Sequence, residues 1–313
     1  EELVQRVQGF HRQLVERVPQ GEEALRYVEA LRLGRGLYDL LIAPVEGYIQ
    51  TASHLVIIPS DVLFYVPFGA LYRCPGCQED LELLQGEFLI ERYSLSYAPS
   101  LASLYWPLLN QGDGVYQSVL SVGANPDPQH PLRYAPEEAR AVAGMFTHGD
   151  LVLLDEATEG TVKNLLAQNR YDVVHISTHG YFDRELPLLS HIQLLAGEEE
   201  DGRLCAGEIL GLGLQGCELV VLSACQTVLP PELAGELVVG DELQGLSQAL
   251  FVARVPSAVL TLWNVNDEST KLLMEAMYRE LMGGAGKAEA LRQAQLSRIQ
   301  SNRHRHPHYW APF

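Results

Sequence analysis

Two stretches, VVHISTHG at residues 173–180 and LVVLSACQ at residues 219–226, decide the fold of this chain. Each begins with aliphatic, mostly β-branched residues, which are typical of strands buried on both faces in a parallel sheet. Each then ends near a reactive side chain, His179 in the first stretch and Cys225 in the second. Open α/β sheets bind ligands beyond the carboxyl ends of their strands. We therefore expect a thiol and an imidazole at one edge of the sheet, as a cysteine nucleophile and its base require.

Strand and helix patterns alternate along the chain from residue 119 onward. The pattern predicts strands at 119–123, 151–154, 172–177, 191–195, 218–224 and 257–263, and helices at 136–146, 161–168, 241–252, 268–282 and 287–300. Strands separated by helices at these spacings predict right-handed βαβ units. The predicted fold class is therefore α/β, with a doubly wound, mostly parallel sheet and helices on both of its faces.

The first third of the chain has a less regular pattern. It predicts two helices within residues 1–33, further helices around 35–45 and at 100–109, and strands at 54–59 and 88–98. Residues 110–114 are polar and glycine-rich, which is typical of a linker. We therefore expect two halves, residues 1–114 and residues 115–313.

Composition and charge disfavour several classes of function. The 313 residues are 47% hydrophobic and carry a net charge of −18, which argues against binding to a phosphate backbone. No apolar run approaches the ~20 residues that span a membrane, and no secretory leader is visible. We expect a cytoplasmic location, no direct binding of nucleic acid and no membrane. The chain starts inside a helical pattern at Glu1, as a fragment of a longer protein would.

The cysteines give little support for a metal site. Five cysteines are an odd number in a large chain, which favours free thiols in a reducing compartment. Cys74 and Cys77 are spaced as half of a zinc site, and His54 or His130 are distant candidates to complete it. A closed tetrahedral site needs two further ligands, so a plain turn with two thiols is the favoured interpretation. No cofactor or metal is predicted.

A cysteine after a buried strand is often an ordinary core residue, so the surroundings of Cys225 matter. The sequence SACQ at residues 223–226 is close to the caspase signature, whose histidine lies about 50 residues upstream. Here His179 precedes Cys225 by 46 residues and is followed by Gly180, which lets a substrate carbonyl approach the backbone closely. His175 fits a buried histidine with satisfied hydrogen bonds better than a ligand, although its position four residues before His179 keeps a supporting role open.

Six segments together resemble a known family. They are HISTHGYFD (175–183), LVVLSACQT (219–227), GDELQGLSQALFVARVPSAVLTLWNVND (240–267), HPHYWAPF (306–313), VIIPSDVLFYVPFGALY (56–72) and LLDEATEGTV (153–162). These segments resemble the CHAT family, which comprises caspase-like domains that are usually found behind tetratricopeptide repeats and are related to separase. The resemblance runs from about residue 35 to the end of the chain.

The resemblance implies cysteine-protease chemistry without a cofactor. Cys225 would attack the scissile carbonyl, and His179 would act as the general acid/base that protonates the leaving amine. The backbone amides of Gly180 and Cys225 would form the oxyanion hole. No third, acidic member is required in this class, and Asp183 reads as part of a loop.

The resemblance also implies how the two halves differ. Residues 115–313 would be the caspase-like catalytic half. Residues 1–114 would be a helical and pseudo-protease half, because its strands end in Pro59 and Pro99 where a dyad needs histidine and cysteine. An upstream tetratricopeptide repeat or sensor region is the implied partner.

Substrate choice depends on a single candidate residue. In separase an acidic residue after the corresponding strand receives a basic side chain, and Asp267 is the matching candidate here. The competing interpretation is that Asp267 caps the helix that starts near Glu268. Residues 227–240 follow the nucleophile and would correspond to a segment that must order, or be cut, before the site works.

The predicted function is a cysteine endopeptidase that cleaves protein substrates. Two alternatives stay open: a catalytically silent caspase-like interaction module (a pseudoprotease), and an unrelated thiol hydrolase acting on small amides or esters. Many family members read S-A-C-E-T-G, whereas this chain has Gln226 and Val228. Val228 stands where the family pattern has a glycine close to the active cysteine, and this difference favours the pseudoprotease alternative.

Overall fold

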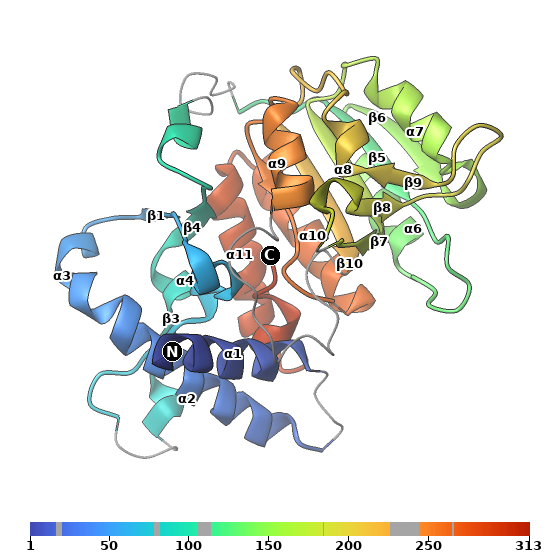
Figure 1. Cartoon of the computed structure of the whole chain (residues 1–313). Coiled ribbons are helices and arrows are strands. Elements are labelled where there is room, and N and C mark those ends of the chain that lie inside the picture. Colours follow the sequence, from blue (N-terminus) through green and yellow to red (C-terminus); the bar gives the residue numbers. More distant parts are fainter. Residues whose placement is uncertain (17–20, 78–81, 106–113, 184, 226–243, 265) are drawn as a thin grey trace.

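The structure is a computed structural model that describes residues 1–313 except 17–20, 78–81, 106–113, 184, 226–243 and 265 (Figure 1). The side chains of Cys225 and Gln244, on either side of the longest gap, also lie outside the description. Across the described residues, none of the helices combines the length and the apolar character that a membrane crossing needs.

A largely parallel sheet forms the centre of the second part of the chain (Figure 1). Among the described residues, five strands run parallel in the order β11-β10-β7-β5-β6, and β8 and β9 continue from β7 in antiparallel pairing. Their bounds are β5 (Ser118–Gly123), β6 (His148–Leu153), β7 (Val173–Tyr181), β8 (His191–Gln193), β9 (Arg203–Cys205), β10 (Leu219–Cys225) and β11 (Ala258–Val259). The predicted α/β class and mostly parallel sheet are confirmed.

Helices cover both faces of this sheet. They are α6 (Ala135–Ala143), α7 (Glu159–Leu166), α8 (Ala206–Ile209), α9 (Gln244–Val252), α10 (Asp267–Met282) and α11 (Lys287–Ile299). Successive strand residues belong to two different apolar clusters, because side chains alternate between the two faces. Val173 and Val221 pack in the cluster that includes α6, α10 and α11, whereas Val174 and Val220 pack with α7, α8 and α9.

The first part of the chain packs against the C-terminal elements. It contains α1 (Glu2–Val15), α2 (Glu23–Leu41), α3 (Glu46–Ile49), β1 (His54–Ile57), β2 (Tyr72–Arg73), β3 (Glu87–Phe88), α4 (Leu89–Arg92) and β4 (Ser94–Tyr97). In Figure 1, α11 lies between these elements and the central sheet, and it contacts both α4 and β4. One apolar cluster joins Phe88 and Trp310, 5.0 Å apart between ring centroids, with Val119 and Val173 of the sheet. The predicted linker at 110–114 falls mainly outside the described residues, so the boundary between the two halves stays a prediction.

The separate helix predicted around residues 35–45 is wrong. Instead α2 continues without a break from Glu23 to Leu41 and is followed by a short 3-10 turn at Ala43–Val45. Glycine inside a helix usually weakens it, yet α2 runs through both Gly34 and Gly36. Gly34 is needed for packing: a Cβ on this residue would lie 2.9 Å from the carbonyl oxygen of Ala70.

Several short elements also differ from the prediction. The single strand expected at 88–98 is split by α4 into β3 and β4, and β9 was not predicted. Within the helix expected at 100–109, Ala102–Leu104 form a 3-10 turn, and residues 106–109 lie outside the described residues. The remaining 3-10 turns are Asp61–Tyr65, Phe68–Ala70, Glu82–Gln85, Leu154–Glu156, Pro187–Leu189 and Pro307–Tyr309.

Candidate active site

The register of two neighbouring strands brings the predicted dyad together. In the parallel pair β7–β10, His179 lies opposite Cys225, and Ser177 lies opposite Ser223. Neighbouring strands are ~4.8 Å apart, so the backbones of His179 and Cys225 are adjacent. The side chain of Cys225 lies outside the described residues. His179 was expected just past the end of its strand, but β7 continues to Tyr181 because residues 179–181 pair with β8.

The imidazole of His179 is held by a backbone carbonyl. Its Nε2 lies 2.7 Å from the carbonyl oxygen of His130. A carbonyl only accepts hydrogen bonds, so Nε2 carries the proton and, in the neutral ring, Nδ1 carries the lone pair. This contact assigns Nδ1 as the basic atom of His179. No sequence pattern could have indicated this role of His130, because every residue has a carbonyl group.

The His130 carbonyl belongs to the loop between β5 and α6, residues 124–134, and local polar contacts shape that loop. The Asn125 side chain accepts a hydrogen bond from the Leu132 amide at 2.9 Å. Asp127 accepts one from the Gln129 amide at 2.8 Å, and its other oxygen lies 2.9 Å from Nδ1 of His130. These contacts give this partly exposed loop a defined shape around the carbonyl.

Asp267 lies next to this loop and does not cap its own helix. The N-cap of α10 is Asn266, whose side chain accepts a hydrogen bond from the Ser269 amide at 3.0 Å. The Asp267 carboxylate instead accepts a hydrogen bond from the Tyr134 amide at 2.9 Å. Burial raises the pKa of Asp267, as does the nearby Glu138 carboxyl, against the lowering effect of the backbone amides that Asp267 accepts from and of His179. The capping interpretation of Asp267 is therefore wrong.

A small cavity lies beside Asp267, beneath the edge of the sheet. Its volume is about 10 Å³, and its walls come from Leu132, Glu138, Ser177, Thr178, Ser223, Asp267 and Thr270. Within the described residues, the side-chain oxygens of Ser223 and Thr270 have no hydrogen-bond partner. A polar space of this size suits one ordered water molecule. A lysine or arginine side chain does not fit into it.

His175 is fully buried below the dyad, as expected for a core histidine. Its Nε2 lies 3.0 Å from a carboxylate oxygen of Glu138, and both side chains are at most 1% exposed. Its Nδ1 lies 3.2 Å from the hydroxyl group of Tyr278, whose pKa burial raises well above its ordinary value. The approach of α6 depends on Gly123 of β5, where a Cβ would lie 2.7 Å from the Ala135 carbonyl oxygen.

Other contacts at the ends of these strands are structural. Gly180, the predicted oxyanion-hole residue on β7, pairs with Ile192 of β8. Thr261 donates a hydrogen bond to the Ala224 carbonyl at 2.6 Å, which holds the chain just before Cys225. Asp183 accepts hydrogen bonds from the amides of Glu185 and Leu186, as its predicted loop role requires.

The described cysteines outside the dyad are poor nucleophiles. Burial raises the pKa of Cys217 to about 12, and burial also raises that of Cys205. Both thiols therefore stay protonated near neutral pH, and a protonated thiol is a weak nucleophile.

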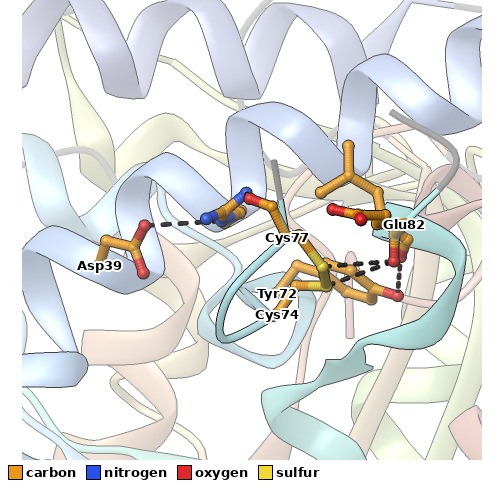
Figure 2. Close-up of a disulfide and its surroundings, with 7 residues drawn as sticks. Asp39, Tyr72, Cys74, Cys77 and Glu82 are labelled. Atoms are coloured by element: carbon orange, nitrogen blue, oxygen red, sulfur yellow. Dashed lines mark hydrogen bonds and ion pairs between the residues drawn. A yellow bond between two sulfur atoms is a disulfide. The ribbon is translucent and has the colours of Figure 1, made fainter. Parts of the chain in front are cut away.

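Cys74 and Cys77 are joined by a disulfide, contrary to the expected turn with two free thiols (Figure 2). Both sulfur atoms lie against the carbonyl oxygen of Glu82, at 3.5 and 3.3 Å, and Arg35 donates a hydrogen bond to the Cys77 carbonyl. Bonded sulfurs are not thiolates, so this pair does not fit a zinc site. His54, one suggested ligand, lies between the hydroxyl groups of Ser94 and Ser96.

A cluster of three glutamates also has the donors for a metal ion, yet a cation already occupies it. Glu159, Glu200 and Glu208 bring their oxygens within 4.8 Å of one another. The Lys163 ammonium group lies 3.4, 2.8 and 2.9 Å from these three carboxylates, respectively. The ammonium group offsets part of their negative charge within the protein, and the raised pKa of Lys163 reflects the same contacts.

Comparison with known proteins identifies the family. The model of the CHAT domain matches residues 31–313, so the chain belongs to the CHAT family. Tetratricopeptide repeat protein 28 of Mus musculus and of Homo sapiens are each 26% identical to this chain over 334 residues. The match covers 89% of this chain but only 13% of each of these relatives. A solved structure of a protein from Geobacter sulfurreducens is 21% identical over 35% of this chain and 50% of its own, and its TM-score of 0.27 carries no argument.

Proposed function

We propose that this chain is a cysteine endopeptidase of the caspase and separase type, with a dyad of His179 and Cys225. The observation that carries the proposal is the backbone pairing of these two residues, combined with the hydrogen bond from His179 to the His130 carbonyl. This contact leaves Nδ1 as the basic atom of a histidine whose backbone is adjacent to that of a cysteine. The family membership and the parallel strand order β6-β5-β7-β10-β11 support a caspase-like, doubly wound fold.

The proposed reaction proceeds through a thioester. The Cys225 sulfur, which passes its proton to Nδ1 of His179 before or during the attack, adds to the scissile carbonyl carbon of the substrate. The negative charge on the carbonyl oxygen is stabilised by the backbone amides of Gly180 and Cys225. When the carbon–nitrogen bond breaks, His179 gives a proton to the leaving amine. A water molecule then loses a proton to His179, attacks the thioester and releases the acid product and the thiol.

The substrate is a protein, and the resemblance to separase would make Asp267 one candidate for its side-chain preference. A carboxylate near His179 would favour lysine or arginine before the cleaved bond, and this assignment stays a prediction. The space next to Asp267 holds about 10 Å³, so a basic side chain would have to approach from the other side of the carboxylate or displace the β5–α6 loop.

An upstream tetratricopeptide repeat or sensor region is the proposed partner and activator. Support comes from the two mammalian relatives, which are named for this repeat and in which the matched region is 13% of the length. The segment proposed to respond to activation, residues 227–240, lies outside the described residues, as do Gln226 and Val228.

Cleavage of a mixed peptide library, read by mass spectrometry, tests the protease directly. The wild-type chain is compared with the variants Cys225→Ala and His179→Ala, and Cys217→Ala serves as the matched control for loss of a buried, unreactive thiol. We expect cuts by the wild type and the control, and none by the two dyad variants. Cleavage that persists in either dyad variant would contradict the assignment. Absence of cleavage by the wild type, also in the presence of the upstream region, would favour the pseudoprotease.

A further inference from the structure

We propose that Asp267 is a positioning residue that acts on His179 through the β5–α6 loop. By accepting the Tyr134 amide, Asp267 fixes the end of this loop, and the loop in turn holds the His130 carbonyl against Nε2 of His179. The inference rests on the proposed function only for its effect on cleavage. Its effect on the imidazole exists whether or not the chain is an active protease.

The His130 carbonyl lies in a part of the loop that needs an additional contact to hold it in place. Residues 129–131 are exposed, so the surrounding core does not fix them. The contacts of Asn125 and Asp127 lie within the loop and give it a shape. They do not fix the loop relative to the sheet that carries His179. A shift of about 1 Å in a catalytic group can cost on the order of 10²-fold in rate.

Asp267 supplies a connection from outside the loop. It is 133 residues away from Tyr134 in the sequence and stands at the first position of α10. The same helix reaches α6 a turn later, where Lys271 pairs with Glu137 at 2.7 Å and lies over the Tyr134 ring at 5.6 Å. The loop is therefore joined at its end to α10, which packs on the sheet together with α6.

Nothing in its own helix requires the Asp267 carboxylate at this place. Asn266 provides the cap of α10, and the partly buried position of Asp267 disfavours its charge. The cavity on one side has room for about one water molecule. Within the described residues, the carboxylate is thus directed to the backbone of the loop. An amide oxygen in the same position would accept the same hydrogen bond, which separates this role from a charged specificity pocket.

The test measures the imidazole itself. Wild type, Asp267→Ala and Asp267→Asn are prepared with ¹⁵N-labelled histidine, and His179→Gln identifies the His179 signals by their loss. We expect the neutral His179 ring to carry its proton on Nε2 in the wild type and in Asp267→Asn. In Asp267→Ala we expect a mixture of the two tautomers. Glu268→Ala, which removes the neighbouring carboxylate that pairs with Arg303, is the matched control and should resemble the wild type.

Cleavage of peptides with a basic or a neutral residue before the cut bond provides the second readout. We expect Asp267→Ala to lose about 10- to 100-fold in kcat on both peptides, with KM little changed. Asp267→Asn should stay within about threefold of the wild type on both. Thermal unfolding of every variant shows whether it is folded.

Three results would overturn the inference. The first is an unchanged His179 tautomer in folded Asp267→Ala. The second is an Asp267→Asn variant as impaired as Asp267→Ala, since charge would then matter more than hydrogen-bond acceptance. The third is a rise in KM restricted to basic peptides in Asp267→Asn, which would assign Asp267 to a specificity pocket. If the wild type cleaves nothing, the proposed protease function fails, and the tautomer measurement still decides the positioning role.

Discussion

At the scale of single residues, the imidazole of His179 depends on two backbone groups of the β5–α6 loop: the His130 carbonyl at its Nε2 and the Tyr134 amide that Asp267 accepts from. His179 and Cys225 stand out because reactive side chains follow apolar strands at the spacing of a known signature. The His130 carbonyl and the Tyr134 amide are backbone groups. Every residue type has the carbonyl, and every type except proline has the amide N–H. Their roles come from the path of a loop, and a sequence pattern does not record that path.

Buried histidines make the chain sensitive to acid. His11 is 3% exposed, lies against the rings of Tyr65 and Trp263, and has a pKa that burial lowers from 6.5 to about 4. The unfolded state takes up this proton near pH 6.5 and the folded state only near pH 4. The free energy of unfolding therefore does not suffer from His11 above pH 6.5, and it falls by about 3 kcal/mol through this one residue as the pH drops from 6.5 to 4.

The variant His11→Phe should remove this part of the acid sensitivity. We expect its free energy of unfolding, measured in urea at several pH values, to fall less steeply than that of the wild type between pH 6.5 and 4. Some slope should remain, because burial also lowers the pKa of His306 to about 4. His148→Phe, at an exposed position on β6, should follow the wild-type curve. Parallel curves for wild type and His11→Phe would contradict the explanation.

At the scale of elements, predictions succeeded where a strand or helix is long and failed where tertiary contacts override local preference. The strands of the parallel sheet and α10 and α11 were predicted to within a few residues. The continuation of α2 through Gly34 was missed, because that glycine serves contact with Ala70 and does not interrupt the helix. Short pairings such as β8–β9 depend on a neighbour that the local sequence does not identify.

The contact between Glu138 and His175 should anchor α6 on β7. Removing one partner of a buried polar contact leaves the other unsatisfied, which typically costs about 1–3 kcal/mol and more for a charged group. We expect Glu138→Met and His175→Leu each to lower the free energy of unfolding by about this amount, and the double variant to lower it by clearly less than the sum. Glu137→Met, which removes the partly exposed pair with Lys271 on the same helix, should cost at most about 1 kcal/mol. Additive effects of Glu138→Met and His175→Leu would show that the contact is not a coupled pair.

The disulfide between Cys74 and Cys77 should contribute little to stability. It closes a loop with a sequence separation of only three residues, and the chain-entropy model gives about 2 kcal/mol at most for so short a loop. We expect dithiothreitol, or Cys74→Ser with Cys77→Ser, to lower the free energy of unfolding by no more than this amount and to leave the dyad unaffected. Mass measurement after alkylation of the unreduced protein checks that the bond is present. Alkylation of both cysteines without a reductant would restore the original expectation of free thiols.

At the scale of the whole molecule, the shared apolar core argues against two independently stable halves. Sequence patterns located several strands of each half but could not show that the C-terminal segment returns to the first. Trp310 packs on Phe88, its indole nitrogen donates a hydrogen bond to the Arg305 carbonyl, and its own carbonyl accepts one from Gln295. His308 likewise lies 2.7 Å, through Nδ1, from the carbonyl oxygen of Leu14 in α1.

Trp310→Ala should therefore destabilise both halves together. Truncating a fully buried tryptophan typically costs 3–5 kcal/mol, and Trp310 is 0% exposed. We expect a single unfolding transition in the wild type and in the variant, shifted to lower urea in the variant, with far-ultraviolet circular dichroism and tryptophan fluorescence changing together. The separate fragments 1–114 and 115–313 should each lack a cooperative transition, because each would expose its side of the shared core. Cooperative folding of either fragment alone, or two separated transitions in Trp310→Ala, would instead mean that the halves are independent domains that merely touch.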